Sequence, residues 1–126
     1  ALYEELHATD NSLVVRVRSG EDSALWTGDI ERWGERYLVA SGADLRATVV
    51  KAPHHGSRTS SSDEFIAAAG AAHVLFTVGR SNQWGFPHPE VVERWRHAGA
   101  QPWDTASRGE LTFRLTGRGV EVESYR

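Results

Sequence analysis

Residues 47–57 read Ala-Thr-Val-Val-Lys-Ala-Pro-His-His-Gly-Ser, a short apolar strand followed at once by a polar loop. The glycine after the two histidines indicates a tight loop from which the imidazoles point in different directions. Polar loops that follow strands are where α/β folds place their sites. This stretch therefore predicts a layered α/β fold with a functional loop at the end of its third strand.

The apolar pattern on either side of this stretch predicts alternating strands and helices. Strands are expected at 12–18, 24–27, 47–50, 73–78, 110–116 and 120–125, with an extended piece at 101–103. Helices are expected from Glu31 to Gly42, from the capping-box pair Ser61 and Glu64 to Gly70, and from Pro89 to Gly99. This alternation predicts an α/β fold with a mixed sheet and about three helices.

The composition of the chain indicates one globular domain. Its 126 residues are 40% hydrophobic and 25% charged, and the net charge of −3 counts against a simple DNA-binding module. Because cysteine is absent, disulfides, thiolate nucleophiles and iron–sulfur clusters are excluded. No apolar run approaches the ~20 residues that span a bilayer. The start at Ala1 without a methionine leads us to expect a piece of a larger protein.

Two loops after strands carry the strongest candidate ligands. Asp29, in Thr27-Gly28-Asp29, could bind or bridge divalent metals, although it could equally cap the helix that begins near Glu31. In the second loop, one of the adjacent imidazoles of His54 and His55 could ligate a metal. The donors that follow, Ser57, Arg58 and Thr59, favour a loop that holds an anion.

Two further loops offer weaker candidates. His88 lies between two prolines at the start of a helix, which would fix its ring direction, although a lone histidine there is more often a cap or surface residue. The loop at 104–109, which contains Thr105, is more simply a plain turn. His7, His73 and His97 are interpreted as core or surface residues.

Taken in order, these elements resemble one family. They are Asp-Asn-Ser-Leu-Val-Val-Arg-Val (10–17), Thr-Gly-Asp-Ile-Glu (27–31), Val-Lys-Ala-Pro-His-His-Gly-Ser (50–57), Thr-Ser-Ser (59–61), Asn82, Gly85, His88-Pro89, and Asp-Thr to Gly over 104–109. The whole chain, 1–126, resembles the C-terminal half of the metallo-β-lactamase-like domain found in ComEC-type bacterial competence channel proteins. Those proteins import transforming DNA.

The resemblance implies an αββα sandwich with two metal ions, zinc or manganese, between its sheets. It implies hydrolysis of a phosphodiester in the DNA strand that is not imported. Asp29 resembles the metal-bridging carboxylate, His54 or His55 and His88 resemble metal ligands, and Asp29 with His55 would be catalytic. Substrate contacts are expected from Ser57, Arg58, Thr59, Asn82 and Thr105. The parent protein would lie in the bacterial inner membrane, with this domain on the periplasmic or extracellular face.

The sequence departs from the family pattern in two places. The upstream signature His-x-His-x-Asp-His, or its His-x-Asp-x-Asp-His variant, is absent, which leaves about three of about six ligands. The stretch 84–89 is longer than the Tyr-Gly-His-Pro form common in the family. Three functions therefore stay open: half of a metal-dependent nuclease, a metal-free scaffold that guides single-stranded DNA, and a phosphodiesterase for another phosphoester.

The missing half leads to two expectations about the chain by itself. We expect weak or no metal binding and no hydrolysis, because half a ligand set holds a cation poorly. Its partners would be single-stranded DNA, the upstream half of the same domain and the membrane channel part of the same protein. An apolar face with some of Trp26, Trp33, Phe76 and Trp84 would be left uncovered and would promote self-association.

Overall fold

Five strands form a mixed sheet whose spatial order follows the sequence, as seen in a computed structural model that describes residues 12–125. Strands β1 (Val15–Ser19) and β2 (Asp22–Trp26) pair antiparallel as a hairpin. Strands β3 (Val49–Lys51), β4 (His73–Phe76) and β5 (Gln101–Asp104) then add in parallel to β2. The α/β class with a mixed sheet is thereby confirmed.

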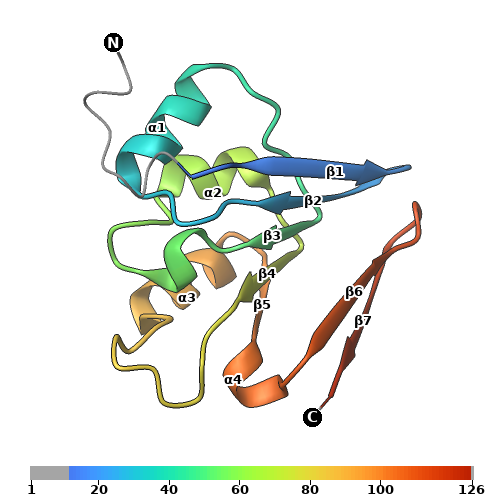
Figure 1. Cartoon of the computed structure of the whole chain (residues 1–126). Coiled ribbons are helices and arrows are strands. Elements are labelled where there is room, and N and C mark those ends of the chain that lie inside the picture. Colours follow the sequence, from blue (N-terminus) through green and yellow to red (C-terminus); the bar gives the residue numbers. More distant parts are fainter. Residues whose placement is uncertain (1–11, 126) are drawn as a thin grey trace.

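Three helices cover one face of the sheet: α1 (Arg32–Ala40), α2 (Asp63–Ala69) and α3 (Pro89–His97) (Figure 1). The core lies between them and the sheet, where Val50 and Val74 pack with Phe65 and Trp95. Each of these side chains is almost fully buried, and burial of one such group contributes about 1.5–3 kcal/mol. In the described part of the chain, no helix is long and apolar enough to cross a membrane.

A second, two-stranded sheet stands against the other face near its β5 edge (Figure 1). It consists of β6 (Leu111–Leu115) and β7 (Val120–Ser124), an antiparallel hairpin. The Phe113 ring lies 6.1 Å from the Trp103 ring and 6.0 Å from the His73 ring. At the hairpin turn, Asp22 Oδ2 accepts hydrogen bonds from the N–H groups of Gly117 and Gly119, at 2.7 and 3.0 Å. The hairpin is therefore fixed at its turn and at the middle of β6.

The remainder of that sheet face is open to solvent near β1. Val15, Val17 and Trp26 are exposed there, and Trp26 exposes 52% of its surface. Of the four residues named for an uncovered apolar face, Trp26 is exposed on this face as expected, whereas Phe76 does not belong to it. Phe76 is only 1% exposed because the strand alternation turns it toward the helices, where it joins the core.

Three local expectations need correction. The N-cap of α2 is Ser62, whose side chain accepts from Phe65 N–H, whereas Ser61 is buried with a left-handed φ of 59°. The segment predicted as a plain turn forms a short helix, α4 (Thr105–Arg108), because Asp104 accepts from Ser107 N–H. The N-cap position of α1 is Glu31, so Asp29 does not serve as its cap.

Candidate functional site

The ends of the parallel strands bring the candidate residues to one edge of the sheet. Asp29 follows β2, His54 and His55 follow β3, and Thr77 follows β4. The turn after β3 is a 3-10 segment, Pro53–Gly56. A cavity of about 440 Å³ opens at this edge. Its lining includes Asp29, His54, His55, Asn82, Trp84 and Phe86.

His55 is held with one ring nitrogen engaged and the other directed at Asp29. Its Nδ1 lies 2.7 Å from the Thr77 carbonyl oxygen and 3.1 Å from Thr77 Oγ1. A carbonyl oxygen only accepts, so Nδ1 carries the proton and Nε2 of the neutral ring presents its lone pair. Nε2 lies 3.4 Å from Asp29 Oδ1, and both side chains are about half exposed. A ligand in the cavity can therefore reach both atoms.

His54 faces a different carboxylate. Its Nε2 lies 3.4 Å from Glu31 Oε1, and its ring is inclined by 61° to that of His55. Its Nδ1 is buried and has no hydrogen-bond partner among the described residues. The two imidazoles diverge, as the sequence predicts. Glu31 was not among the predicted site residues, although the Thr-Gly-Asp-Ile-Glu stretch contains it.

The turn that carries the histidines is strained. His54 and His55 have φ values of 50° and 57°, in the left-handed region that costs about 1–3 kcal/mol for a residue with a Cβ. Gly56 follows with φ of 87°, and a Cβ there would lie 2.6 Å from Pro87 Cβ. Gly56 O also accepts from His88 N–H at 3.1 Å. The turn and the loop before α3 are thus in direct contact.

A buried carboxylate stabilises the loop that follows the turn. Glu35, on α1 and inaccessible to solvent, accepts from Ser61 N–H at 2.5 Å and from Ser62 N–H at 2.7 Å. Trp95 Nε1 donates to Ser61 Oγ at 3.0 Å, and Arg94 Nη1 donates to the Ser61 carbonyl at 2.6 Å. Helices α1 and α3 together hold this loop. Ser60 Oγ, in the same loop, donates to the Pro53 carbonyl at 2.9 Å and so ties the loop to the histidine turn. Sequence reasoning missed Glu35.

The predicted anion contacts after the turn point elsewhere. Ser57 Oγ and Thr59 Oγ1 lie 2.9 Å apart and satisfy each other, and Arg58 Nε lies 2.7 Å from Glu90 Oε1. Arg58 and Thr59 line a different cavity, of about 270 Å³. The structure therefore does not bring these three residues to the Asp29–His55 cavity.

Asn82 and Thr105 use their polar groups to hold the backbone. The Asn82 amide donates to the carbonyls of Gly79 and Phe86, at 3.1 and 2.9 Å, and accepts from Phe86 N–H at 2.7 Å. Thr105 Oγ1 donates to Val78 O at 2.7 Å and accepts from Val78 N–H at 2.8 Å. Asn82 lines the cavity, whereas Thr105 lies outside its lining. Their contact with a substrate stays a prediction.

His88 occupies the N-cap position of α3 without a side-chain cap bond. Its ring packs edge-on against Phe86 with centroids 5.5 Å apart, and Phe86 packs in the same way against His54 at 5.9 Å. His88 does not belong to the cavity lining that contains Asp29 and His55. Over residues 12–125, no group of three or more His, Cys, Asp and Glu residues is placed to hold a metal ion.

Lys51 is a further residue that sequence reasoning left unassigned. Its Nζ donates to the Gly28 carbonyl at 3.1 Å, directly beside Asp29. Burial lowers the pKa of the Lys51 ammonium, and the Asp29 carboxylate acts in the opposite direction. Lys51 ends the strand that pairs with the one before Thr27-Gly28-Asp29. Its place at the end of a predicted strand was the signal that could have identified it.

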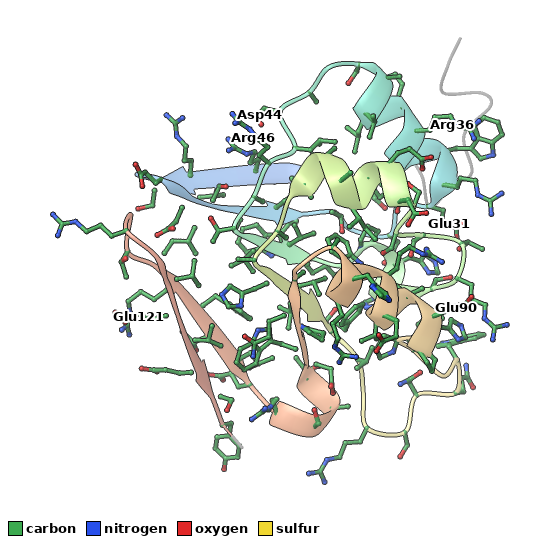
Figure 2. All side chains as sticks on the ribbon, turned by 180° about the vertical axis from the view of Figure 1, so that it is seen from behind. Glu31, Arg36, Asp44, Arg46, Glu90 and Glu121 are labelled. Carbon is green, nitrogen blue, oxygen red and sulfur yellow. The ribbon has the colours of Figure 1, made fainter. Side chains whose placement is uncertain are left out.

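A larger cavity lies away from this site. It measures about 650 Å³ and is lined by Arg16, Arg18 and Arg46, near the amino ends of the parallel strands. Figure 2 shows Arg46 and Asp44 near the top of the view, left of its centre, well apart from Glu31 at the right. Asp44 forms ion pairs with Arg16 and Arg46 there, and the hydrogen bonds from Arg46 lower the pKa of the Asp44 carboxyl. They do not contribute to the Asp29–His55 cavity.

Comparison with known proteins places the chain beside competence proteins. No family model matches it. It is 35% identical over 118 residues to the uncharacterized protein YcaI of Escherichia coli K12, which covers 93% of the chain and 16% of that protein. It is 28% identical over 109 residues to ComE operon protein 3 of Bacillus subtilis, which covers 86% of the chain and 14% of that protein. It is 35% identical over 126 residues to competence protein ComA of Neisseria gonorrhoeae, a match that covers 98% of the chain and 18% of that protein.

The chain thus spans less than one fifth of the length of these relatives. The similarity nevertheless runs along nearly all of its own residues. These matches support the predicted resemblance to a domain of ComEC-type competence proteins.

Proposed function

We propose that this chain supplies half of a divalent-metal site that hydrolyses phosphodiesters in a DNA-uptake protein. The observation that carries the proposal is the orientation of His55. Metal-bound histidines generally donate their other ring N–H to a carbonyl or carboxylate, and His55 donates to the Thr77 carbonyl. Its free nitrogen faces the carboxylate of Asp29.

The spacing of these two donors fits a metal ion. Two donors each about 2.1 Å from a tetrahedral zinc ion lie about 3.4 Å apart. His55 Nε2 and Asp29 Oδ1 are separated by 3.4 Å. His54 Nε2 and Glu31 Oε1 have the same separation, but the Nδ1 of His54 lacks a described partner that would orient the ring. The geometry therefore favours His55 over His54 as the ligand that acts with Asp29.

The residues of this chain would orient the metal ligands. A bound metal would polarise the phosphodiester and lower the pKa of its bound water. Thr77 fixes the tautomer of His55, and Glu35 holds the loop behind the turn. Lys51 places a cation beside Asp29, where it would balance the charge of that carboxylate.

The remaining ligands would come from the upstream half of an αββα metallo-β-lactamase-like domain. That half would add its sheet over the open face at Val15, Val17 and Trp26. In this proposal the parent protein lies in the inner membrane with the domain outside the cytoplasm. Its substrate is the DNA strand that is not imported, and the metal is zinc or manganese.

The experiment compares hydrolysis by the full-length parent protein and by its Asp29→Asn, His55→Asn and His54→Asn variants. Single-stranded DNA and bis(p-nitrophenyl) phosphate serve as substrates, with manganese or zinc supplied. We expect the first two variants to lose about 100-fold or more in rate, since each removes a donor to the metal, whereas His54→Asn loses less.

Two outcomes would refute parts of the proposal. If the wild-type protein cleaves neither substrate with either metal, the domain is a scaffold and the hydrolase proposal fails. If it cleaves the small phosphoester but leaves DNA intact, the phosphodiesterase alternative replaces the nuclease.

A further inference from the structure

An exposed tryptophan stands at the mouth of the Asp29–His55 cavity. Trp84, in the loop between β4 and α3, exposes 64% of its surface and also lines the cavity. Its ring stacks on Phe86, with centroids 6.5 Å apart and an interplanar angle of 26°. A single exposed aromatic residue is ordinary on a protein surface. A function for Trp84 therefore has to be argued from the residues around it.

The loop holds this stack in a defined orientation. The three hydrogen bonds of the Asn82 amide fix Phe86 and Gly79, and Gly85 N–H reaches the Asn82 carbonyl at 3.4 Å. Gly85 has a φ of 68°, which a residue with a Cβ adopts only under strain. Trp84 is therefore presented by a loop whose backbone is held by hydrogen bonds, and its ring packs on Phe86 before any ligand arrives. Such preorganisation lowers the entropic cost of binding.

The cavity combines two chemically different walls. Trp84 and Phe86 form an apolar, flat wall, and Asp29 with His55 forms a polar wall that, on the proposed function, receives a phosphodiester. A ligand that carries a flat ring next to a phosphodiester is a nucleotide within a strand. Arg80 is exposed in the same loop, outside the cavity lining, where its charge would attract the phosphates of neighbouring nucleotides.

We propose that Trp84 is a stacking platform for an unpaired nucleobase, so that the cavity takes single-stranded rather than duplex nucleic acid. Stacking on an aromatic ring accepts any base, because every base has a π-face. A base inside a duplex is already stacked on its neighbours and does not reach the indole without being unpaired. This inference rests on the proposed function for the position of the phosphate, and it adds the form of the strand that binds.

The test measures binding of the 126-residue chain to fluorescein-labelled oligonucleotides by anisotropy, at low salt and with EDTA so that no hydrolysis occurs. Three probes of equal length are used: a thymidine strand, an abasic strand with the same phosphates, and a duplex. We expect Trp84→Ala to weaken binding of the thymidine strand about 5- to 150-fold, the range of one lost stack. Trp84→Phe should retain most of the affinity, and binding of the abasic strand should stay unchanged.

A matched control is Trp33→Ala. Trp33 lies on α1, is 52% exposed and is not part of the cavity lining, so its loss should leave binding of all three probes unchanged. The inference is overturned if Trp84→Ala weakens the thymidine and abasic strands equally, if it leaves the thymidine strand unaffected, or if the wild-type chain binds no single strand. The binding assay contains EDTA, so its result does not depend on metal or on hydrolysis. If the parent protein fails to hydrolyse either substrate but Trp84→Ala still weakens binding of the thymidine strand, only the hydrolase proposal is refuted.

Discussion

The Nδ1 atom of His55 lies 2.7 Å from the carbonyl oxygen of Thr77, and this contact fixes the imidazole tautomer. We expect the neutral ring to carry its proton on Nδ1 at pH 8, which is the less common tautomer of free histidine. Long-range ¹H–¹⁵N correlation spectra of the chain, assigned with His55→Gln, would identify it. A dominant Nε2–H tautomer would contradict the proposal that Nε2 of His55 is unprotonated and binds the metal.

Glu35 gives a prediction about stability. Glu35→Ala removes the acceptor of two backbone N–H groups, those of Ser61 and Ser62, and leaves them unsatisfied beside a buried loop. We expect a loss of about 3 kcal/mol in the free energy of unfolding, measured by urea denaturation. Arg36→Ala, one position along the same helix on its exposed side, should change stability by less than about 0.5 kcal/mol. Equal effects of both substitutions would show that Glu35 does not hold the loop.

Gly56 gives a prediction about packing between two loops. In Gly56→Ala, the added methyl group would meet Pro87 Cβ at 2.6 Å and Phe76 Cδ1 at 2.9 Å, on a backbone with φ of 87°. We expect a loss of about 3 kcal/mol or more. Gly42→Ala is the matched control, because Gly42 has φ of 76° but no atom within 4 Å of the added methyl, and it should cost only about 1 kcal/mol. Similar thermal shifts for both variants would indicate that the contact with Pro87 is unimportant.

His73 gives a prediction about pH. Burial lowers the pKa of His73 below 6.5, and its Nδ1 accepts a hydrogen bond from Trp103 Nε1 at 3.1 Å. The unfolded chain binds this proton more readily than the folded one, so the free energy of unfolding falls as the pH drops from 6.5 toward the folded pKa. His73→Asn keeps an acceptor but does not titrate. Between pH 7.5 and 5.0, we expect its melting temperature to fall less than that of the wild type; parallel declines would refute the prediction.

The sequence predicts most elements of the fold because their apolar periodicity is local. The strands and the three long helices lie within a few residues of the predicted ranges, and a proline at the first helical position located the start of α3 correctly. The site is different, because a polar side chain near a cavity can bind either a ligand or its own backbone. Asn82 and Thr105 hold loop backbone through contacts that sequence spacing does not reveal.

Glu35 and the cap of α2 were mispredicted for the same physical reason, namely contacts that depend on the fold. Glu35 resembles an ordinary surface residue of an amphipathic helix, and only the fold places two N–H groups of a distant loop beside it. The cap of α2 moved by one residue because Ser61 is buried under Trp95, where its hydroxyl accepts a hydrogen bond. Both effects depend on partners more than 25 residues away. His7, interpreted as part of the start of the chain, lies outside the described residues.

The parallel pairing of β2, β3 and β4 has a kinetic consequence for the site. Asp29, His55 and Thr77 each follow one of these strands, and each pairing joins segments that are separated by a crossover connection. Loop closure must precede such contacts, so they form slowly and late during folding. A slip of one residue in either pairing would turn the strand faces over and separate the imidazole from its carboxylate. The juxtaposition of Asp29 and His55 at this edge would therefore form only near the end of the folding reaction.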